Sequence, residues 1–481
     1  MNELLDEVDV LEVSGDPSSA EVLRIDYDSR RVEPGSLFFC LPGTRTDGHR
    51  FAPEAVRRGA VGLVYEHELP PLPASLVVRA RVAPGCARAV MGRAAARLAG
   101  HPARALVMAG VTGTNGKTTV SHLLSGIFEH AGMVATAIGT LSGSRTTPEA
   151  PDLERLLTET RDRSAAAGRR GAVAMEVSSH ALAQSRVEGI RFDVAIFTNL
   201  SQDHLDFHRT MEAYFEAKAA LFTPERARQG VVNADDTWGR QLLAQPRIPL
   251  VAVRPSVVPA AVTFSGSCFR WRGFRVELPL IGRCNVDNAL LAAEAAVRVG
   301  IDPPAVVDAL ANARGVPGRM ELVAGPPQGL GFWAMVDYAH TPAALETVLA
   351  EARRLVAPDA RVLVVFGCGG HRDVGKRPQM GAVAAQGADQ VFLTSDNPRD
   401  EDPNRIIADV AAGIDLGFAS SGRLVVEPDR RTAIALAVGQ AQPGDLVVVA
   451  GKGHETVQEI GSRLVAFDDR TVLREVLRCS R

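Results

Sequence analysis

Short apolar runs alternate with amphipathic stretches along most of the 481-residue chain. The apolar runs that we interpret as buried strands lie at 105–109, 172–175, 194–197, 230–232, 333–336, 361–366, 391–394 and 446–450. Segments with helical spacing follow several of them, as at 120–130, where Leu123, Leu124, Ile127 and Phe128 recur. Another helix is expected to open at Thr146-Thr147-Pro148, because Pro is favourable in a first turn. Alternation of this kind predicts an α/β fold with mostly parallel sheets, because parallel strands need a crossover between them.

A glycine-rich turn at Gly113 to Thr119 joins the first of these strands to a helix. Such a turn directs backbone N–H groups at an anion, and the helix dipole adds to the attraction. Lys117 would reach the β- and γ-phosphates, and the hydroxyl of Thr118 would bind Mg²⁺. The general phosphate-loop pattern has Gly where this chain has Val111, but the Gly-Lys-Thr ending agrees. ATP or GTP is the predicted ligand.

Two breaks divide the pattern into three α/β domains, as the length also suggests. His101-Pro102 ends one helix, and residues 315–319 form a second linker. We predict a small N-terminal domain at 1–103 and a central domain at 104–315, built on a parallel sheet like that of phosphate-loop ATPases. The C-terminal domain at 316–481 is expected to be Rossmann-like.

Composition excludes several classes of protein. The formal net charge of −3 gives no electrostatic case for nucleic acid or an anionic membrane. No apolar run approaches the ~20 residues of a membrane span, and the acidic start does not resemble a signal peptide. The six cysteines are scattered without a Cys-x-x-Cys pair. We therefore expect a cytoplasmic protein without nucleic-acid or membrane partners.

Acidic residues follow two strands of the predicted central domain. Glu176 ends one strand, and Asp203, His204 and Asp206 follow the next. A carboxylate beside a phosphate loop is well placed to bind Mg²⁺, so these residues form a candidate metal site. Lys218, alone on a helix, would ordinarily be a solvated charge.

Polar residues at other element ends have ordinary interpretations as well as functional ones. Asn285 and Asn288 lie near the start of a helix, where helix capping is the simpler interpretation and an amide clamp on adenine is the alternative. In the C-terminal domain, four strands lead into polar loops at 337–342, 367–373, 395–399 and 451–455. Because ligands of open α/β sheets bind at the carboxyl ends of strands, all four loops should border one crevice.

Together these residues resemble the Mur ligase family, and within it the branch that adds the third amino acid of the peptidoglycan precursor. The motifs that carry the resemblance are Asp28-Ser29-Arg30, Gly113 to Thr119, Thr146-Thr147-Pro148, Glu176 to His180, Thr198 to Asp206, Gly318-Arg319-Met320-Glu321, Asp337 to Pro342, Gly367 to Pro378, Asp396 to Arg399 and Gly451 to Glu455. They span nearly the whole chain in the family's order. The resemblance implies a monomeric, ATP-dependent amide ligase with three small-molecule substrates: UDP-N-acetylmuramoyl-L-alanyl-D-glutamate, meso-diaminopimelate and ATP.

The resemblance also implies a role for each group of residues. The UDP group would lie against Tyr27, Ser29, Thr44, Arg45 and Thr46, and the muramoyl peptide against Thr146, Thr147, Ser178, Gln184 and Arg186. ATP would bind Gly113, Thr114, Asn115, Gly116, Lys117, Thr118, Thr119, Asn285, Asn288, Arg319 and Asp337. Lys117, Glu176, His204 and Lys218 would be catalytic, with Thr118, Glu176, His204 and a carbamylated Lys218 holding Mg²⁺. Diaminopimelate would contact Arg372, Asp396, Asn397, Pro398, Arg399, Gly451 and Glu455.

The acceptor amino acid follows from Arg399. Diaminopimelate and L-lysine differ by one carboxylate at the far end, and a guanidinium binds a carboxylate in bidentate fashion. Lysine-adding relatives generally lack this arginine, so a lysine-adding enzyme is the alternative, with another Mur-like amide ligase as the next. Two residues depart from the family pattern. His371 replaces an Asp beside Arg372, and Cys284 replaces an aromatic residue before Asn285.

Overall fold

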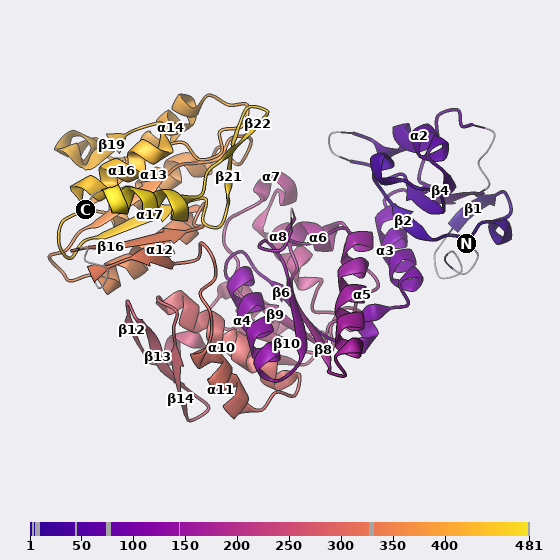
Figure 1. Ribbon diagram of the computed structural model, residues 1–481, viewed down its shortest axis with the longest axis horizontal. Coiled ribbons are helices and arrows are strands. Elements are labelled where there is room, and N and C mark those ends of the chain that lie inside the picture. Colours follow the sequence, from indigo (N-terminus) through magenta and orange to yellow (C-terminus); the bar gives the residue numbers. More distant parts are fainter. Residues whose placement is uncertain are drawn as a thin grey trace.

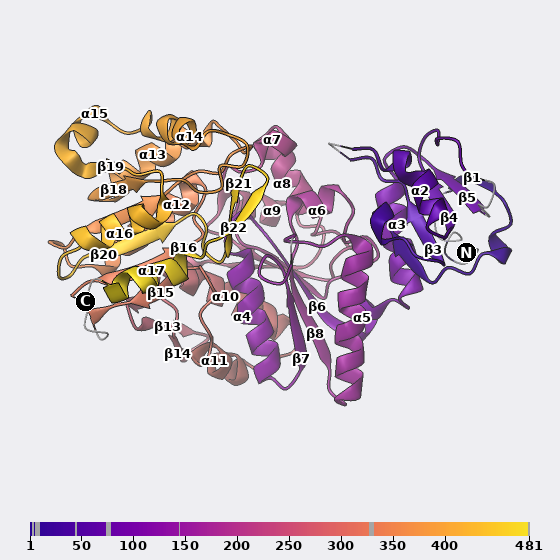
Figure 2. The same ribbon diagram turned by 45° about the horizontal axis from the view of Figure 1, so that its top comes forward.

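The computed structural model describes residues 1, 4, 10–43, 46–73, 78–143, 145–326 and 331–479. Three large sheets follow one another along the chain, each covered by its own helices (Figure 1). The first and third units lie at opposite ends of the molecule with the second between them, as Figure 2 also shows. The prediction of three α/β units is therefore confirmed.

The N-terminal unit is a five-stranded sheet in the order β1-β5-β4-β3-β2, parallel except for β1. Phe38 and Phe39 point to opposite faces of this sheet, as neighbours on a strand must. Phe38 packs with helix α2 and Phe39 with helix α3, and both are fully buried. The bounds are β1 Val10–Ser14, β2 Arg24–Asp26, β3 Ser36–Phe39, α2 Ala52–Arg57, β4 Ala60–Tyr65, β5 Val78–Val82 and α3 Ala87–Leu98.

The central unit contains a six-stranded, wholly parallel sheet in the order β11-β10-β9-β6-β8-β7. Strand β6 is buried along its length, because α4 and α10 cover one face and α5 the other. The strands are β6 Leu106–Thr112, β7 Val134–Ile138, β8 Gly171–Glu176, β9 Val194–Phe197, β10 Gly230–Asn233 and β11 Leu250–Val253. A small antiparallel sheet adds β12 Ala260–Thr263, β13 Gly266–Trp271 and β14 Phe274–Leu278.

The helices of the central unit connect these strands. They are α4 Lys117–His130, α5 Ala150–Ala166, α6 Ser179–Ala183, α7 Leu205–His208, α8 Met211–Ala219, α9 Thr237–Ala244, α10 Arg283–Arg298 and α11 Pro303–Ala311. One expected boundary is wrong. We expected Thr146-Thr147-Pro148 to open a helix, but α5 begins at Ala150 and Pro151 is the proline of its first turn.

The C-terminal unit has the sheet order β15-β16-β20-β17-β18-β19, parallel except for β15. Its strands are β15 Glu321–Ala324, β16 Trp333–Asp337, β17 Val362–Phe366, β18 Gln390–Leu393, β19 Leu424–Val426 and β20 Leu446–Ala450. A hairpin of β21 Val457–Ile460 and β22 Arg463–Ala466 extends beyond them. The helices are α12 Pro342–Leu355, α13 Lys376–Gly387, α14 Pro403–Ala411, α15 Leu416–Phe418, α16 Arg430–Gln440 and α17 Asp469–Cys479.

Within the described residues, no helix has both the length and the apolar character needed to cross a membrane.

Candidate active site

The phosphate loop lies between β6 and α4 and depends on two glycines with positive φ. A Cβ on Gly113 (φ 147°) would lie 1.9 Å from Thr198 Oγ1, and one on Gly116 (φ 85°) would lie 2.4 Å from Asn288 Oδ1. No other residue fits such close approaches. Lys117 Nζ donates to the carbonyls of Gly113 and Thr114 at 2.9 and 2.8 Å. The loop therefore folds around Lys117, the residue that the sequence pattern predicts to bind phosphate.

The residues predicted to bind adenosine line a hollow of about 100 Å³ next to this loop, which we call the adenosine hollow. Asn285 and Asn288 face it from α10, and Asn285 donates to the carbonyl of Ile281 at 2.8 Å. The helix is capped by Gly282 without a side-chain hydrogen bond. The capping hypothesis for the two asparagines is therefore wrong, and both amides face the hollow beside the phosphate loop.

Arg319 and Asp337 complete this hollow from the third unit. The Arg319 guanidinium lies over the ring of Tyr338, 4.3 Å from its centroid, and donates to Thr118 Oγ1 at 3.2 Å. Asp337 accepts from the backbone N–H groups of Met320 and Ala339, both at 2.7 Å. The hollow therefore lies at the boundary between the central and C-terminal units.

Glu176 ends strand β8 and is 1% exposed. Its Oε1 accepts from the N–H of Thr140 at 2.8 Å, and its Oε2 from the Thr140 hydroxyl at 3.2 Å. The same hydroxyl lies 3.1 Å from that of Thr146. A cavity of about 290 Å³ is bordered by Glu176, Thr146 and the phosphate loop.

His204 lies in the same cavity wall, in a left-handed conformation at φ 55°. Burial lowers the pKa of its imidazole to about 4, so the ring is neutral near pH 7 and its lone pair is available to a metal. Its Nε2 lies 3.5 Å from Asp203 Oδ2. Carboxylate and hydroxyl oxygens, which suit Mg²⁺, and a neutral imidazole therefore border the same cavity.

Lys218 is not solvated, contrary to our expectation for a lone helical lysine. It is 1% exposed on α8, and its Nζ donates to the carbonyl of Gly113 at 2.7 Å. The ring of Tyr214 lies beneath it, with the centroid 4.6 Å from Nζ. Burial lowers the pKa of the amine well below its ordinary value, and Lys117 adds to the effect. The buried amine is therefore readily uncharged.

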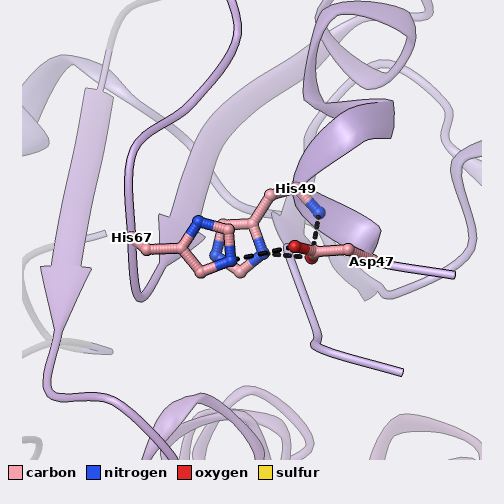
Figure 3. A group of neighbouring side chains, drawn as sticks. All are labelled: Asp47, His49 and His67. Atoms are coloured by element: carbon pink, nitrogen blue, oxygen red, sulfur yellow. Dashed lines mark hydrogen bonds and ion pairs between the residues drawn. The ribbon is translucent and has the colours of Figure 1, made fainter. Parts of the chain in front are cut away.

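A different cluster of metal-binding side chains lies in the N-terminal unit, where Asp47, His49 and His67 converge (Figure 3). The two imidazoles stack with centroids 3.6 Å apart, and each directs a nitrogen at the Asp47 carboxylate, at 2.6 and 2.9 Å. His49 Nε2 accepts the N–H of Glu66 at 3.0 Å, which places the ring hydrogen on Nδ1. Because Nδ1 carries the hydrogen, it has no lone pair to offer a metal. The cluster is therefore a set of polar contacts that holds the loop containing Asp47.

The residues predicted to hold UDP are only partly described. Thr44 and Arg45 lie outside the described residues. The Tyr27 hydroxyl donates to Asp152 at 2.6 Å, across the boundary between the first two units. The Ser29 hydroxyl donates to Glu54 at 3.0 Å. Thr46 approaches Gly43 closely, because a Cβ on Gly43 would lie 2.5 Å from the carbonyl oxygen of Thr46.

The residues predicted to contact the muramoyl peptide form a continuous hydrogen-bonded group. The Thr147 hydroxyl donates to the carbonyl of Glu176 at 2.8 Å and accepts from the N–H of Ser178 at 3.0 Å. Arg186 donates to the carbonyl of Thr147 at 3.0 Å and to Gln184 Oε1 at 2.6 Å. The structure therefore links Thr147, Ser178, Gln184 and Arg186 into one group at the carboxyl end of β8.

The four strand-end loops of the C-terminal unit border the same cavity, as predicted. In the third loop, Asn397 Nδ2 donates to Glu455 Oε2 at 2.8 Å, and the fully buried Lys452 donates to Asn397 Oδ1 at 3.0 Å. Asp396 is 7% exposed, and its Oδ2 has no hydrogen-bond partner within the described residues. An unpaired buried carboxylate oxygen in a cavity wall favours a cationic ligand there.

Arg399 and Arg372 line this end of the cavity. Arg399 Nη1 donates to the carbonyl of Gly370 at 2.6 Å. The two loops touch so closely that a Cβ on Gly370 would lie 2.0 Å from the carbonyl oxygen of Pro398. Gly451 (φ 114°) lies against Asp396 in the same way, since a Cβ on Gly451 would lie 2.6 Å from Asp396 Oδ2. Glycines are therefore required where the loops meet.

Of the two departures from the family pattern, His371 precedes the cavity residue Arg372 and Cys284 lines the adenosine hollow. His371 has φ 50°, and its N–H donates to Glu401 Oε1 at 2.5 Å, while its exposed ring lies 3.8 Å from Asp400. Cys284 Sγ lies 3.4 Å from Met320 Sδ beside the adenosine hollow. Burial keeps the pKa of the Cys284 thiol well above its ordinary value.

Two residues of the cavity were not singled out from the sequence. Lys376 lines it and donates to the carbonyl of His340 at 2.7 Å. Thr140 holds both oxygens of Glu176. Lys376 lies inside the motif Gly367 to Pro378, which was the available signal, whereas nothing in the sequence near Thr140 indicates its contact with a residue 36 positions away.

Comparison with known proteins agrees with this geometry along the whole chain. Three family models match: "Mur ligase family, catalytic domain" over residues 21–99, "Mur ligase middle domain" over 111–296 and "Mur ligase, glutamate ligase domain" over 318–453. The chain is 42% identical over 492 residues to a UDP-N-acetylmuramoyl-L-alanyl-D-glutamate–2,6-diaminopimelate ligase of Streptomyces coelicolor, covering 98% of this chain and 95% of that protein.

Solved structures match over the same length. A UDP-N-acetylmuramoyl-L-alanyl-D-glutamate–2,6-diaminopimelate ligase is 35% identical with a TM-score of 0.65, covering 100% of this chain and 98% of that one. A MurF ligase of Thermotoga maritima in complex with ADP shares the fold at 18% identity, with a TM-score of 0.61 over 95% of this chain and 96% of that one. With three family models and a relative at 42% identity spanning it, the chain belongs to the Mur ligase family.

Proposed function

We propose that this protein joins meso-diaminopimelate to UDP-N-acetylmuramoyl-L-alanyl-D-glutamate at the expense of ATP, giving the UDP-linked tripeptide used in peptidoglycan synthesis. The relatives that span the chain bear the name of this ligase activity. The observation that carries the proposal is that Arg399 borders the same cavity as Lys117 and Glu176. A guanidinium suited to a carboxylate therefore faces the groups suited to ATP.

ATP is the energy source, and the phosphate loop with Asn285, Asn288, Arg319 and Asp337 is its proposed site. Thr118, Glu176, His204 and a carbamylated Lys218 would hold Mg²⁺, which neutralises charge between two anionic reactants when bound. Glu176 is already fixed by Thr140, and His204 is neutral, so both are prepared as ligands. Thr118, Glu176 and His204 all line the cavity, which supports their assignment to one metal site.

The reaction needs an activated carboxyl group, because a carboxylate is a poor acyl donor. An oxygen of the D-glutamyl carboxylate attacks the γ-phosphorus of ATP, and the bond to the bridging oxygen breaks so that ADP leaves with that electron pair. Lys117 and the loop N–H groups stabilise the charge on the transferred phosphoryl group. The amine of diaminopimelate then attacks the acyl phosphate carbonyl, and the C–O bond to phosphate breaks to leave an amide.

The attacking ammonium group must lose its protons, and His340 is our candidate base. Its Nδ1 lies 2.8 Å from the carbonyl oxygen of Tyr338, which places the ring hydrogen there and leaves Nε2 as an acceptor. Burial lowers the pKa of His340, so the ring is neutral at pH 7. It lines the cavity that the phosphate loop and Arg399 also border. His204 is the other candidate, but its assignment to Mg²⁺ would occupy the same imidazole.

The far end of diaminopimelate carries an ammonium and a carboxylate on one carbon. Asp396, with its unpaired Oδ2, suits the ammonium, and Arg399 suits the carboxylate. L-lysine has only the ammonium at that end, so some N–H donors of the Arg399 guanidinium would lack an acceptor. Donors left without an acceptor in a closed site cost free energy, and discrimination between the two amino acids follows from that cost.

The remaining assignments follow the units of the fold. Residues 1–103 are the proposed UDP domain, 104–315 the ATP domain and 316–481 the amino-acid domain. Tyr27, Ser29 and the loop at 44–46 would contact UDP, while Thr146, Thr147, Ser178, Gln184 and Arg186 would contact the muramoyl peptide. We propose a monomer that acts in the cytoplasm, where ATP is available.

Phosphate release by the purified protein tests this proposal. ATP, Mg²⁺ and UDP-N-acetylmuramoyl-L-alanyl-D-glutamate would be combined with meso-diaminopimelate in one series and with L-lysine in another. We expect turnover with diaminopimelate alone. Turnover with lysine would keep the ligase and reject the specificity argument, and no turnover with either would reject the ligase with these substrates.

Replacement of the guanidinium tests the acceptor site separately. Arg399→Ala should raise the KM for diaminopimelate about tenfold to hundredfold, because hydrogen bonds to charged groups are lost, and should leave the KM for ATP nearly unchanged. Steady-state kinetics with each substrate varied in turn measures both constants. Equal loss for both substrates would contradict the assignment.

A further inference from the structure

The guanidinium of Arg399 is held from two sides. Its Nη1 donates to the carbonyl of Gly370 at 2.6 Å, and its Nε forms an ion pair with Oε2 of Glu459 at 2.7 Å. These contacts leave at least one free hydrogen on each of the two terminal nitrogens, Nη1 and Nη2. The edge formed by Nη1 and Nη2 can bind a carboxylate in bidentate fashion. Glu459 therefore fixes the direction of the side chain without occupying its carboxylate-binding edge.

The backbone of Arg399 is held by the same hairpin, β21–β22. Arg399 has φ 54°, a conformation that a residue with a side chain keeps only when its surroundings impose it. Its N–H donates to the carbonyl of Glu459 at 3.0 Å, and its own carbonyl accepts from the N–H of Gly461 at 2.7 Å. The hairpin thus forms a one-residue parallel bridge with the loop.

Two neighbouring residues of the loop are tied to the hairpin as well. Asn397 Oδ1 accepts from the N–H of Glu459 at 3.0 Å, and the carbonyl of Asp396 accepts from Gln458 Nε2 at 2.6 Å. Main-chain contacts therefore hold the loop whatever the side chain at 459. The contribution specific to the Glu459 side chain is its ion pair with Arg399.

We propose that Glu459 is a positioning residue that orients the Arg399 guanidinium for the far carboxylate of the acceptor amino acid. This inference rests on the proposed function, since it assumes that Arg399 receives that carboxylate. A free arginine must be ordered when a ligand binds, and that cost reduces affinity. Glu459 orders the side chain before the amino acid arrives, so the cost has already been met.

Neutralisation of Arg399 by Glu459 would have the opposite effect on affinity. The Glu459 side chain is 39% exposed, and water screens an ion pair at such a position, which limits the loss of positive charge. Orientation should therefore outweigh neutralisation. The two effects predict changes of opposite sign when the carboxylate is removed.

Glu459→Ala and Glu459→Gln test the inference, with Arg463→Ala on the other strand of the hairpin as the matched control. We expect Glu459→Ala to raise the KM for meso-diaminopimelate about threefold to tenfold, from the cost of ordering one long side chain. Glu459→Gln, which keeps the side-chain length and a polar oxygen beside Nε, should show a smaller rise. The KM for ATP, the KM for the UDP precursor and kcat should stay near those of the wild type in all three variants.

Other results would overturn it. A fall in the KM for diaminopimelate would mean that Glu459 competes with the substrate for Arg399. An equal loss for all three substrates would mean that the side chain supports only the fold, and an unaltered KM in Glu459→Ala would mean that it does nothing for Arg399. Wild-type protein that does not use diaminopimelate would instead refute the proposed function, an outcome visible before any variant is made.

Discussion

Lys218 shows how burial changes the chemistry of a single residue. Carbon dioxide reacts with an uncharged amine, and burial lowers the pKa of the Lys218 amine well below its ordinary value. The resulting carbamate would be an anion, able to bind a second metal ion beside the phosphate loop. Such an anion would also relieve the repulsion between Lys218 and Lys117, which contributes to the lowered pKa.

Activity should therefore depend on carbon dioxide. We expect protein kept free of carbon dioxide to lose most of its ligase activity and to regain it on addition of bicarbonate. Lys218→Gln should be inactive and insensitive to bicarbonate. Isotopically labelled bicarbonate should give a carbamate signal by NMR in the wild type and in the control Lys376→Gln, but not in Lys218→Gln. A fully active protein with an unmodified Lys218 would contradict the prediction.

Many of the candidate site residues predicted from the sequence line the cavity or the adenosine hollow, but few of their contacts were predicted. Gly113, Lys117 and Thr118 follow a local pattern, and a local pattern can be read without a structure. Asn285 and Lys218 were misjudged from local features, because burial and the neighbours across the cavity decide their roles. Thr140, in the turn after β7, carries no local signal, since only its contact with Glu176 on β8 draws attention to it.

Helix α5 contains a carboxyl group that should govern how stability depends on pH. Glu154 is 3% exposed, and its Oε2 has no hydrogen-bond partner within the described residues. Burial raises its pKa to about 8, against an ordinary value of 4.5. The folded protein therefore binds more protons than the unfolded chain between these values, so stability falls as pH rises from about 4.5 to about 8.

Glu154→Gln removes the titrating group, so its stability should not fall with pH in this way. Relative to the wild type, we expect the free energy of unfolding of the variant to rise by at most about 1.4 kcal/mol per pH unit through that range. The difference in Tm between the two proteins should be larger at about pH 9 than at about pH 5.5. Glu159→Gln, at an exposed position of the same helix, is the control. A difference in Tm that does not change with pH would show that Glu154 titrates normally.

Elements were easier to predict than their ends or their partners. The runs that become β9 and β20 agree residue for residue with expectation, since a strand buried on both faces is apolar throughout. The start of α5 was misplaced because Pro148 and Pro151 both satisfy the rule for a first turn. Hairpin β21–β22 was not predicted, because its residues are partly exposed and lack a continuous apolar run.

At the scale of the molecule, the cavity exists only because the central and C-terminal units face each other. Phe264, in the turn after β12, stacks on Trp333 of β16 with centroids 3.9 Å apart and planes 5° from parallel. The N–H of Arg283 on α10 donates to Glu351 Oε2 on α12 at 2.5 Å. These contacts lie outside the cavity, so they act on its closure without touching a substrate.

Loss of the aromatic stack should loosen this closure. An aromatic pair contributes about 0.5–1.5 kcal/mol beyond its buried area, so Phe264→Ala should shift the balance towards open arrangements by up to about tenfold. Small-angle X-ray scattering should give a larger radius of gyration for the unliganded variant, reversed by ATP and both other substrates, because they bind across the boundary. Phe274→Ala, at an exposed position of the same small sheet, should leave the radius unchanged. If both variants behave alike, the aromatic stack does not set the closure, and contacts such as Arg283–Glu351 and Arg319–Thr118 hold the two units together.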